Sequence, residues 1–252
     1  DGLKDIYTYS SAMGAGIMVY KNVGTYDSIV FEVAKDVLYT YFKGNFSYKL
    51  NLPIFTVDIP GIVDIEGDGD MDILTFDPLG GAYLQLYRNI SQELYGNSDS
   101  LEFSCIDEYW GYFMESDSSN DVELHNTPPD WFGAYKNYFE DYSQIPGAPG
   151  GEVYNPYFDG ARTPERHAGS TVFPNDMDAD GDVDVIIGDI EYPMLIEFEN
   201  GKNDFNQVRD TIIKTTMNFP SYDVPIHIQQ MPAIFYIDLD RDGIRDMISA
   251  PM

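Results

Sequence analysis

Residues 64–72 read Asp64-Ile65-Glu66-Gly67-Asp68-Gly69-Asp70-Met71-Asp72, an acidic stretch whose pattern, acid-x-acid-x-Asp-Gly-x-x-Asp, recurs along the chain. Two more complete copies are Asp176-Met177-Asp178-Ala179-Asp180-Gly181-Asp182-Val183-Asp184 and Asp238-Leu239-Asp240-Arg241-Asp242-Gly243-Ile244-Arg245-Asp246. The first five residues, Asp1-Gly2-Leu3-Lys4-Asp5, fit the last five places of the pattern, as if the chain were cut inside a fourth copy. The complete copies are named loops 1, 2 and 3, and residues 1–5 are named the partial loop.

The spacing of these acids favours a bound cation. Two unit charges about 4 Å apart repel by about 1 to 4 kcal/mol, depending on screening, so four or five carboxylates in one tight loop need a positive ion among them. Calcium accepts about 6 to 8 oxygen ligands in flexible geometry, whereas magnesium keeps fewer protein ligands and zinc prefers His or Cys. The glycine at the sixth place permits a sharp turn. A seventh residue that offers its backbone carbonyl would explain why that place holds Asp70, Asp182, Ile244 and Leu3 alike.

The segments that follow the loops predict β-strands and exclude an EF-hand. An EF-hand needs a glutamate at its twelfth place and helices on both sides, but the twelfth residues here are Thr75, Ile187 and Ser249. Short apolar stretches rich in β-branched residues follow the loops at 73–76, 185–187 and 247–249, and follow the partial loop at 6–9. A merely solvated acidic turn is the alternative for one copy, and the repetition in register disfavours it.

The repeat continues beyond the loops. The last loop aspartate precedes an aromatic-x-Asn triplet by 17, 17 and 16 residues in the pairs Asp5–Asn22, Asp72–Asn89 and Asp184–Asn200. Each triplet ends a second predicted strand, turn residues and another apolar stretch follow, and a further strand leads into the later loops. About four short strands per unit predict the blade of a β-propeller. The predicted units are about 1–57, 58–169, 170–231 and a partial 232–252, with an insertion at about 104–168 inside the second unit. A blade without a metal loop is the competing interpretation of that insertion.

The loops, the strands after them and the aromatic-x-Asn triplets resemble FG-GAP or VCBS repeats, which build the calcium-bearing β-propellers of integrin α-chains and of many secreted bacterial proteins. The resemblance implies an all-β fold, here a partial propeller of about three to four blades, with calcium in each complete loop and a truncated site in the partial loop. The side-chain ligands that it implies are Asp64, Glu66, Asp68 and Asp72 in loop 1, Asp176, Asp178, Asp180 and Asp184 in loop 2, and Asp238, Asp240, Asp242 and Asp246 in loop 3. The expected metal sites also include the seventh residues Asp70, Asp182, Ile244 and Leu3, and Asp1 and Asp5 of the partial loop. Glu66 departs from the usual Asp or Asn and has a longer side chain.

Composition limits the classes of partner. The 252 residues carry 43 acidic and 14 basic side chains, a formal charge of −29, so the chain lacks the basic face that nucleic acids or anionic membranes require. No apolar run reaches the roughly 20 residues of a membrane-spanning helix. An apolar content of 43% is ample for a folded core. The single cysteine permits no internal disulfide. We expect an extracellular, secreted or cell-surface chain that forms part of a larger protein.

Three functions fit these observations. The first is a non-enzymatic platform for adhesion or binding, in which calcium is structural and the partner is a protein or a carbohydrate at the cell surface. The second is an enzyme acting on polysaccharide, a lyase or hydrolase, with His125, His167, Arg162, Arg166 and the tyrosines of the insertion as candidate residues. The third is a subunit of a large cell-envelope or secretion assembly. No nucleophile elbow and no phosphate-binding glycine loop occurs, so the sequence assigns no catalytic residue and no organic cofactor. The sequence therefore favours a binding protein and leaves the enzymatic alternative open.

Overall fold

The computed structural model describes residues 3–11, 16–25, 27–42, 45–78, 81–116, 119–124 and 169–251. Strands dominate this part of the chain. Its single helix, α1 (Ser91–Tyr95), has five residues, so no described helix is long and apolar enough to cross a membrane. The predicted all-β fold is therefore confirmed.

The sheets that adjoin the partial loop and loops 1, 2 and 3 are named the first to the fourth sheet, in chain order. The third sheet shows the repeating unit in its simplest form. Its strands are β12 (Ser170–Asn175), β13 (Asp184–Asp189), β14 (Leu195–Asn200) and β15 (Ile212–Met217). They pair in sequence order, each antiparallel to the next. Loop 2 joins the first strand of this sheet to the second. The unit of about four strands that the sequence predicts is therefore present here.

The second sheet contains the same four strands and two more. The repeated strands are β6 (Gly61–Val63), β7 (Asp72–Phe76), β8 (Leu84–Asn89) and β9 (Phe103–Asp107). Loop 1 joins β6 to β7, and α1 lies between β8 and β9. The hairpin of β4 (Tyr39–Phe42) and β5 (Asn45–Asn51) extends this sheet, because β4 pairs with β9 in parallel. The sequence did not predict this extension.

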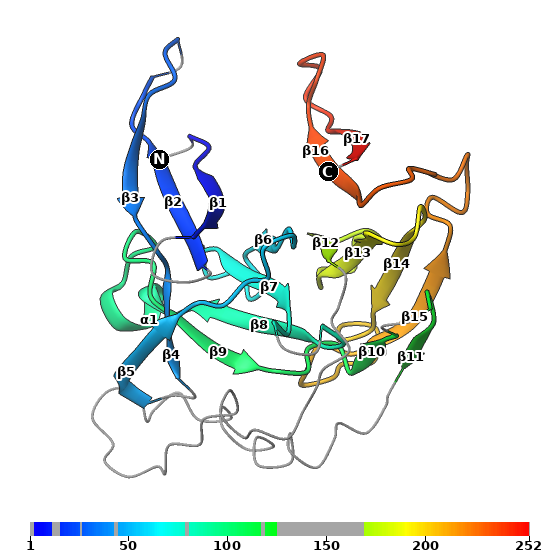
Figure 1. Ribbon diagram of the computed structural model, residues 1–252, viewed down its shortest axis with the longest axis horizontal. Helices are drawn as coiled ribbons and strands as arrows, with labels where there is room; N and C mark the ends of the chain where they lie inside the picture. The colour runs from blue at the N-terminus through cyan, green and yellow to red at the C-terminus, as the bar shows by residue number, and fades with distance from the viewer. Residues whose placement is uncertain are drawn as a thin grey trace.

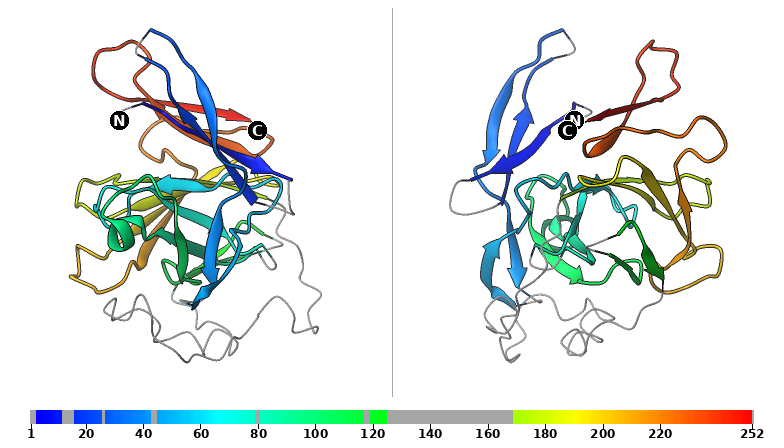
Figure 2. Two further views of the ribbon diagram at one scale, coloured as in Figure 1. Left: turned by 90° about the vertical axis from the view of Figure 1, so that its left-hand side faces the viewer. Right: turned by 45° about the vertical axis from the view of Figure 1, so that its right-hand side comes forward.

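Two smaller sheets lie at the ends of the array. The first sheet has the strands β1 (Ile6–Ser10), β2 (Gly16–Asn22) and β3 (Phe31–Lys35), and the fourth has β16 (Pro232–Ile237) and β17 (Asp246–Pro251). Loop 3 joins β16 to β17. In Figures 1 and 2 both end sheets project to the same side of the central second and third sheets. The described sheets do not form a closed ring.

Successive sheets pack face to face, which explains why the strands after loops 1 and 2 are apolar on both faces. On β7, Ile73 contributes to the core between the first and second sheets, and its neighbour Leu74 to the core between the second and third. On β13, Val185 contributes to that second core, and Ile186 to the core between the third and fourth sheets. Because consecutive side chains in a strand point to opposite faces, an uninterrupted apolar run is required wherever a sheet has a neighbour on each side.

Part of the predicted insertion belongs to this core. Trp110 and Phe113 are fully buried in the cluster between the second and third sheets. The backbone N–H of Ile212 on β15 donates a hydrogen bond to the carbonyl of Gly111 over 2.8 Å. The hairpin of β10 (Phe113–Glu115) and β11 (Val122–Leu124) follows. Tyr109 packs edge-on against Tyr83, with ring centroids 5.1 Å apart, in a smaller separate cluster. Residues 125–168 of the predicted insertion lie outside the described residues.

Candidate metal centres

The three complete loops share one backbone conformation. The fourth residue of each is left-handed, with φ of 75° at Gly67, 66° at Ala179 and 66° at Arg241. The glycine at the sixth place has φ of 96°, 92° and 90° in loops 1, 2 and 3. Side chains with a Cβ rarely adopt φ near 90°, so the sixth place requires glycine, whereas the fourth place accommodates Ala179 and Arg241 at the smaller positive angle. A repeated sequence pattern therefore corresponds to a repeated local structure.

The first and last acids of each loop bind backbone N–H groups of the same loop. The N–H of the sixth residue donates to the first aspartate, over 3.0 Å to Asp64, 3.2 Å to Asp176 and 3.0 Å to Asp238. The N–H of the second residue donates to the ninth, over 2.9 Å to Asp72, 2.8 Å to Asp184 and 3.0 Å to Asp246. These bonds hold the two ends of each loop together and fix the direction of both carboxylates.

The other oxygen of the ninth residue explains the predicted register. The backbone N–H of Asn89 donates to Asp72 Oδ1 over 2.8 Å, and that of Asn200 donates to Asp184 Oδ1 over 2.8 Å. In the partial loop the N–H of Asn22 donates to Asp5 Oδ1 over the same distance. The constant separation between the loop and the aromatic-x-Asn triplet thus places the end of one strand beside the last loop acid. Leu3 is also described, whereas the predicted ligand Asp1 lies outside the described residues.

The seventh residue has a role that the sequence reasoning missed. Asp70 and Asp182 are buried, and each accepts a backbone N–H from the segment after the third repeated strand of its sheet: that of Gln92 of α1 over 3.2 Å and that of Asn203 over 2.8 Å. The equivalent residue of loop 3, Ile244, is 70% exposed. The one available signal was that two of the three complete loops carry aspartate where any residue would supply a carbonyl.

Loops 2 and 3 bring the same three acids together. Carboxylate oxygens of Asp176, Asp178 and Asp184 lie within 4.8 Å of one another, and so do those of the equivalent residues of loop 3. The loop 3 residues are Asp238, Asp240 and Asp246. Asp180 and Asp242, at the fifth place, each accept the N–H two residues later, over 2.9 and 2.7 Å. Converging oxygen atoms of this kind match the preference of a hard divalent ion such as calcium.

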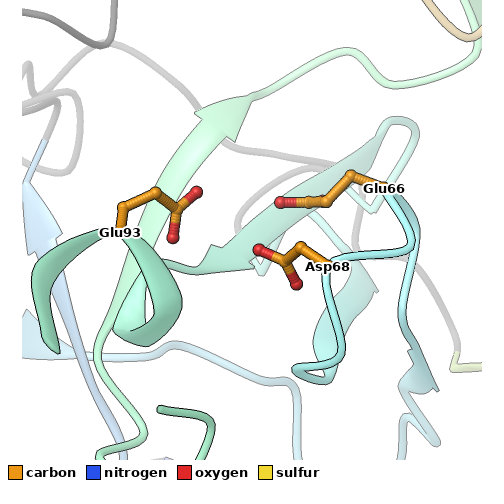
Figure 3. A group of neighbouring side chains, drawn as sticks. All are labelled: Glu66, Asp68 and Glu93. Carbon is orange, nitrogen blue, oxygen red and sulfur yellow. The ribbon is translucent and has the colours of Figure 1, made fainter. Parts of the chain in front are cut away.

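Loop 1 groups its acids differently. Here Glu66 and Asp68 lie within 4.8 Å of Glu93, which belongs to α1 and not to the loop. Figure 3 shows the side chains of Glu66 and Asp68 on the loop facing Glu93 on the helix. Arg88 of β8 forms ion pairs with both Glu66 and Glu93, and its Nη2 lies 3.0 Å from Glu93 Oε1. Neither Arg88 nor Glu93 was among the predicted site residues.

The electrostatics of the loops favour added positive charge. Burial, followed by the nearby loop carboxylates, raises the pKa of Asp70 and of Asp72 to about 7. The same causes raise the pKa of Asp184 to about 7 and that of Asp182 to about 6, although backbone N–H donors oppose the shift. Asp182 Oδ1 and Asp180 Oδ2 are buried and accept no hydrogen bond from any described residue. Unsatisfied oxygens beside a converging trio of acids fit a cation in loop 2.

The histidines and arginines named for the enzymatic alternative, His125, His167, Arg162 and Arg166, lie outside the described residues. In comparisons with known proteins, no family model, no curated protein and no solved structure matches this chain. The assignment of a function therefore depends on the geometry of the loops and sheets.

Proposed function

We propose that this chain is a calcium-stabilised β-protein that serves as an extracellular binding platform, with the metal in a structural role. The observation that carries the proposal is the convergence of Asp176, Asp178 and Asp184, matched by the equivalent residues of loop 3, at the turn between the first two strands of a sheet. A calcium ion there would be held by carboxylate oxygens, neutralise the crowded acids and fix the turn. The FG-GAP and VCBS resemblance is consistent with this role.

A propeller-like arrangement of blades is part of the same proposal. The second and third sheets each contain a meander of four antiparallel strands, and each packs with its two faces against neighbouring sheets. Blades of a propeller are related in this way. The loops that join the first and second strands then occupy equivalent positions in successive blades. This supports a repeated structural metal and not one reactive centre.

Exposed apolar side chains favour contact with a protein partner. On and beside β3 the exposed fractions are 75% for Ile29, 46% for Val30, 38% for Phe31 and 51% for Val33. A group of exposed apolar residues on one segment is typical of an interaction surface. The formal charge of −29 also disfavours nucleic acid and anionic lipid as partners.

Thermal melting with and without divalent ions tests the proposal. The chain is freed of metal with a chelator, and its Tm is measured alone, with excess calcium and with excess magnesium. An ion that binds only the folded state at about 100 times its Kd stabilises by about 2.7 kcal/mol per site, which is about 5 to 10 °C in a chain of this size. Calcium should therefore raise the Tm and magnesium should restore little.

The variant Asp240→Asn provides the matched comparison. It keeps the size of an exposed loop 3 side chain and one acceptor oxygen, but it removes the charge, so its calcium-dependent increase in Tm should be smaller than that of the wild type. A Tm that does not respond to chelator or calcium would contradict a structural metal.

A further inference from the structure

Arg88 places a positive charge beside the third residue of loop 1, where a cation bound to that residue would also lie. Its side chain is only 15% exposed, and its guanidinium pairs with Glu66 at the third place of loop 1 and with Glu93 of α1. The side chains of Glu66 and Glu93 are 19% and 25% exposed. A partly buried pair of this kind is screened less by solvent than a surface ion pair. Loop 1 therefore already holds a positive group at a predicted ligand.

The third sheet carries a carboxylate at the position of Arg88. The residue before the triplet asparagine is Arg88 in the second sheet and Glu199 in the third. The counterparts of Glu66 and Glu93 are Asp178 and Asp204, and oxygens of Asp178, Glu199 and Asp204 lie within 4.8 Å of one another. Glu199 pairs with Lys214 of β15, whose side chain is 60% exposed. Three equivalent positions are thus acid, Arg, acid around loop 1 and all acidic around loop 2.

The grouping of the loop carboxylates also distinguishes loop 1 from loops 2 and 3. In loops 2 and 3 the first, third and ninth residues converge, as described above. The corresponding residues of loop 1, Asp64, Glu66 and Asp72, are all described but do not form such a group, and Glu66 is instead directed to Arg88 and Glu93. A guanidinium in contact with a ligand carboxylate repels a divalent ion and occupies the oxygen that the ion needs. Both differences lower the affinity of loop 1 for calcium.

We propose that Arg88 replaces the metal in loop 1, so that of the complete loops only loops 2 and 3 bind calcium. The inference rests on the proposed function, because it assigns the same calcium to particular loops. The ion pairs of Arg88 would then connect loop 1, β8 and α1 whether or not calcium is present. The second sheet would then keep its loop in place when calcium is withdrawn, whereas the third and fourth sheets would not.

Equilibrium dialysis of the whole chain against calcium provides the test, read as the change in bound ions per chain. Asp64→Asn should leave the number unchanged, and Asp178→Asn and Asp240→Asn should each lower it by one. The exchange variants should act in opposite directions: Arg88→Glu should add one ion, and Glu199→Arg should remove one. Lys21→Glu is the control, because Lys21 occupies the equivalent position beside the partial loop and pairs only with the exposed Asp99 in the described structure.

The outcomes separate this inference from the proposed function. Loss of one ion in Asp64→Asn would overturn the role of Arg88 and leave a calcium-binding protein. A chain that binds no calcium would overturn the proposed function itself. If circular dichroism shows that Arg88→Glu does not fold, Asp64→Asn still decides, since that substitution keeps an acceptor oxygen for the loop N–H groups. Arg88→Gln should also lower the Tm in chelator, and by no more with calcium than without it, and a decrease seen only with calcium would overturn the proposal.

Discussion

The backbone N–H of Asn89 donates a hydrogen bond to Asp72 Oδ1 over 2.8 Å, and this bond joins the end of β8 to the end of loop 1. The other oxygen of Asp72 accepts the N–H of Ile65 over 2.9 Å. The carboxylate of Asp72 thus satisfies two backbone donors, and it connects the start of loop 1, the end of loop 1 and the end of β8. The same geometry recurs at Asp184, so the last acid of the loop is a structural residue with or without an ion.

Replacement of Asp184 by alanine should destabilise the chain even in excess chelator. Asp184 is buried, and it accepts the N–H groups of Met177 and Asn200 over 2.8 Å each. Each buried donor left without an acceptor costs about 1 to 3 kcal/mol, so we expect a loss of about 2 to 6 kcal/mol in the free energy of unfolding. Urea denaturation followed by circular dichroism measures it. Asp204→Ala, an exposed acid beside the same loop, is the control and should change stability by about 0.5 kcal/mol or less. Equal effects of the two variants would contradict a structural role for Asp184.

The register of the repeat could be predicted because hydrogen bonds of one kind recur. Asp5, Asp72 and Asp184 each bind the N–H of an asparagine that the sequence spacing identifies. The strands after loops 1 and 2 could be predicted because both of their faces are buried against neighbouring sheets and their side chains are therefore mainly apolar. Local conformation and burial leave a periodic trace in the sequence.

Features that occur once leave no such trace. Arg88 on β8 contacts Glu66 in loop 1. Only a comparison of Arg88 with Glu199, the residue at the equivalent position of the third sheet, would have identified Arg88 from the sequence. Glu93 reaches loop 1 because it lies on α1, which follows β8. The five residues of α1 are too few to give a strong helical signal in the sequence. The parallel pairing of β4 with β9 joins segments about 60 residues apart, and strand pairing of that kind depends on tertiary packing and not on local propensity.

Trp110 should prove essential although it lies inside the predicted insertion. Its side chain is fully buried between the second and third sheets. Truncation of a buried aromatic residue to alanine costs about 3 to 5 kcal/mol, so Trp110→Ala should lose about that much free energy of unfolding in urea. Trp110→Phe should lose less, because it leaves a smaller cavity and removes an indole N–H that has no hydrogen-bond partner. Tyr222→Ala is the control, since Tyr222 is 79% exposed. If Trp110→Ala were as stable as Tyr222→Ala, the segment after β9 would not belong to the core.

Glu115 provides a buried acid away from the loops. Glu115 on β10 is 4% exposed, and its Oε2 accepts no hydrogen bond from the described part of the chain. Burial, then the negative charges of Asp189 and Asp58, raises the pKa of Glu115 to about 8. Asp58 itself accepts the N–H of Ser170 over 3.0 Å, and burial raises its pKa to about 7. The folded chain therefore holds protons here that the unfolded chain releases.

The free energy of unfolding should fall as the pH rises through the range in which Glu115 differs between the two states. Below the ordinary pKa of 4.5 both states are protonated, and from there to about pH 8 only the folded state retains the proton. One such proton gives a slope of up to about 1.4 kcal/mol per pH unit. Glu115→Gln cannot ionise, so its stability in urea at pH 5, 6.5 and 8, with chelator present, should fall less steeply than that of the wild type. Glu123→Gln, on the exposed side of β11, should parallel the wild type. A Glu115→Gln curve that also ran parallel would show that Glu115 is ionised in the folded chain across this range, with its charge balanced by a positive group.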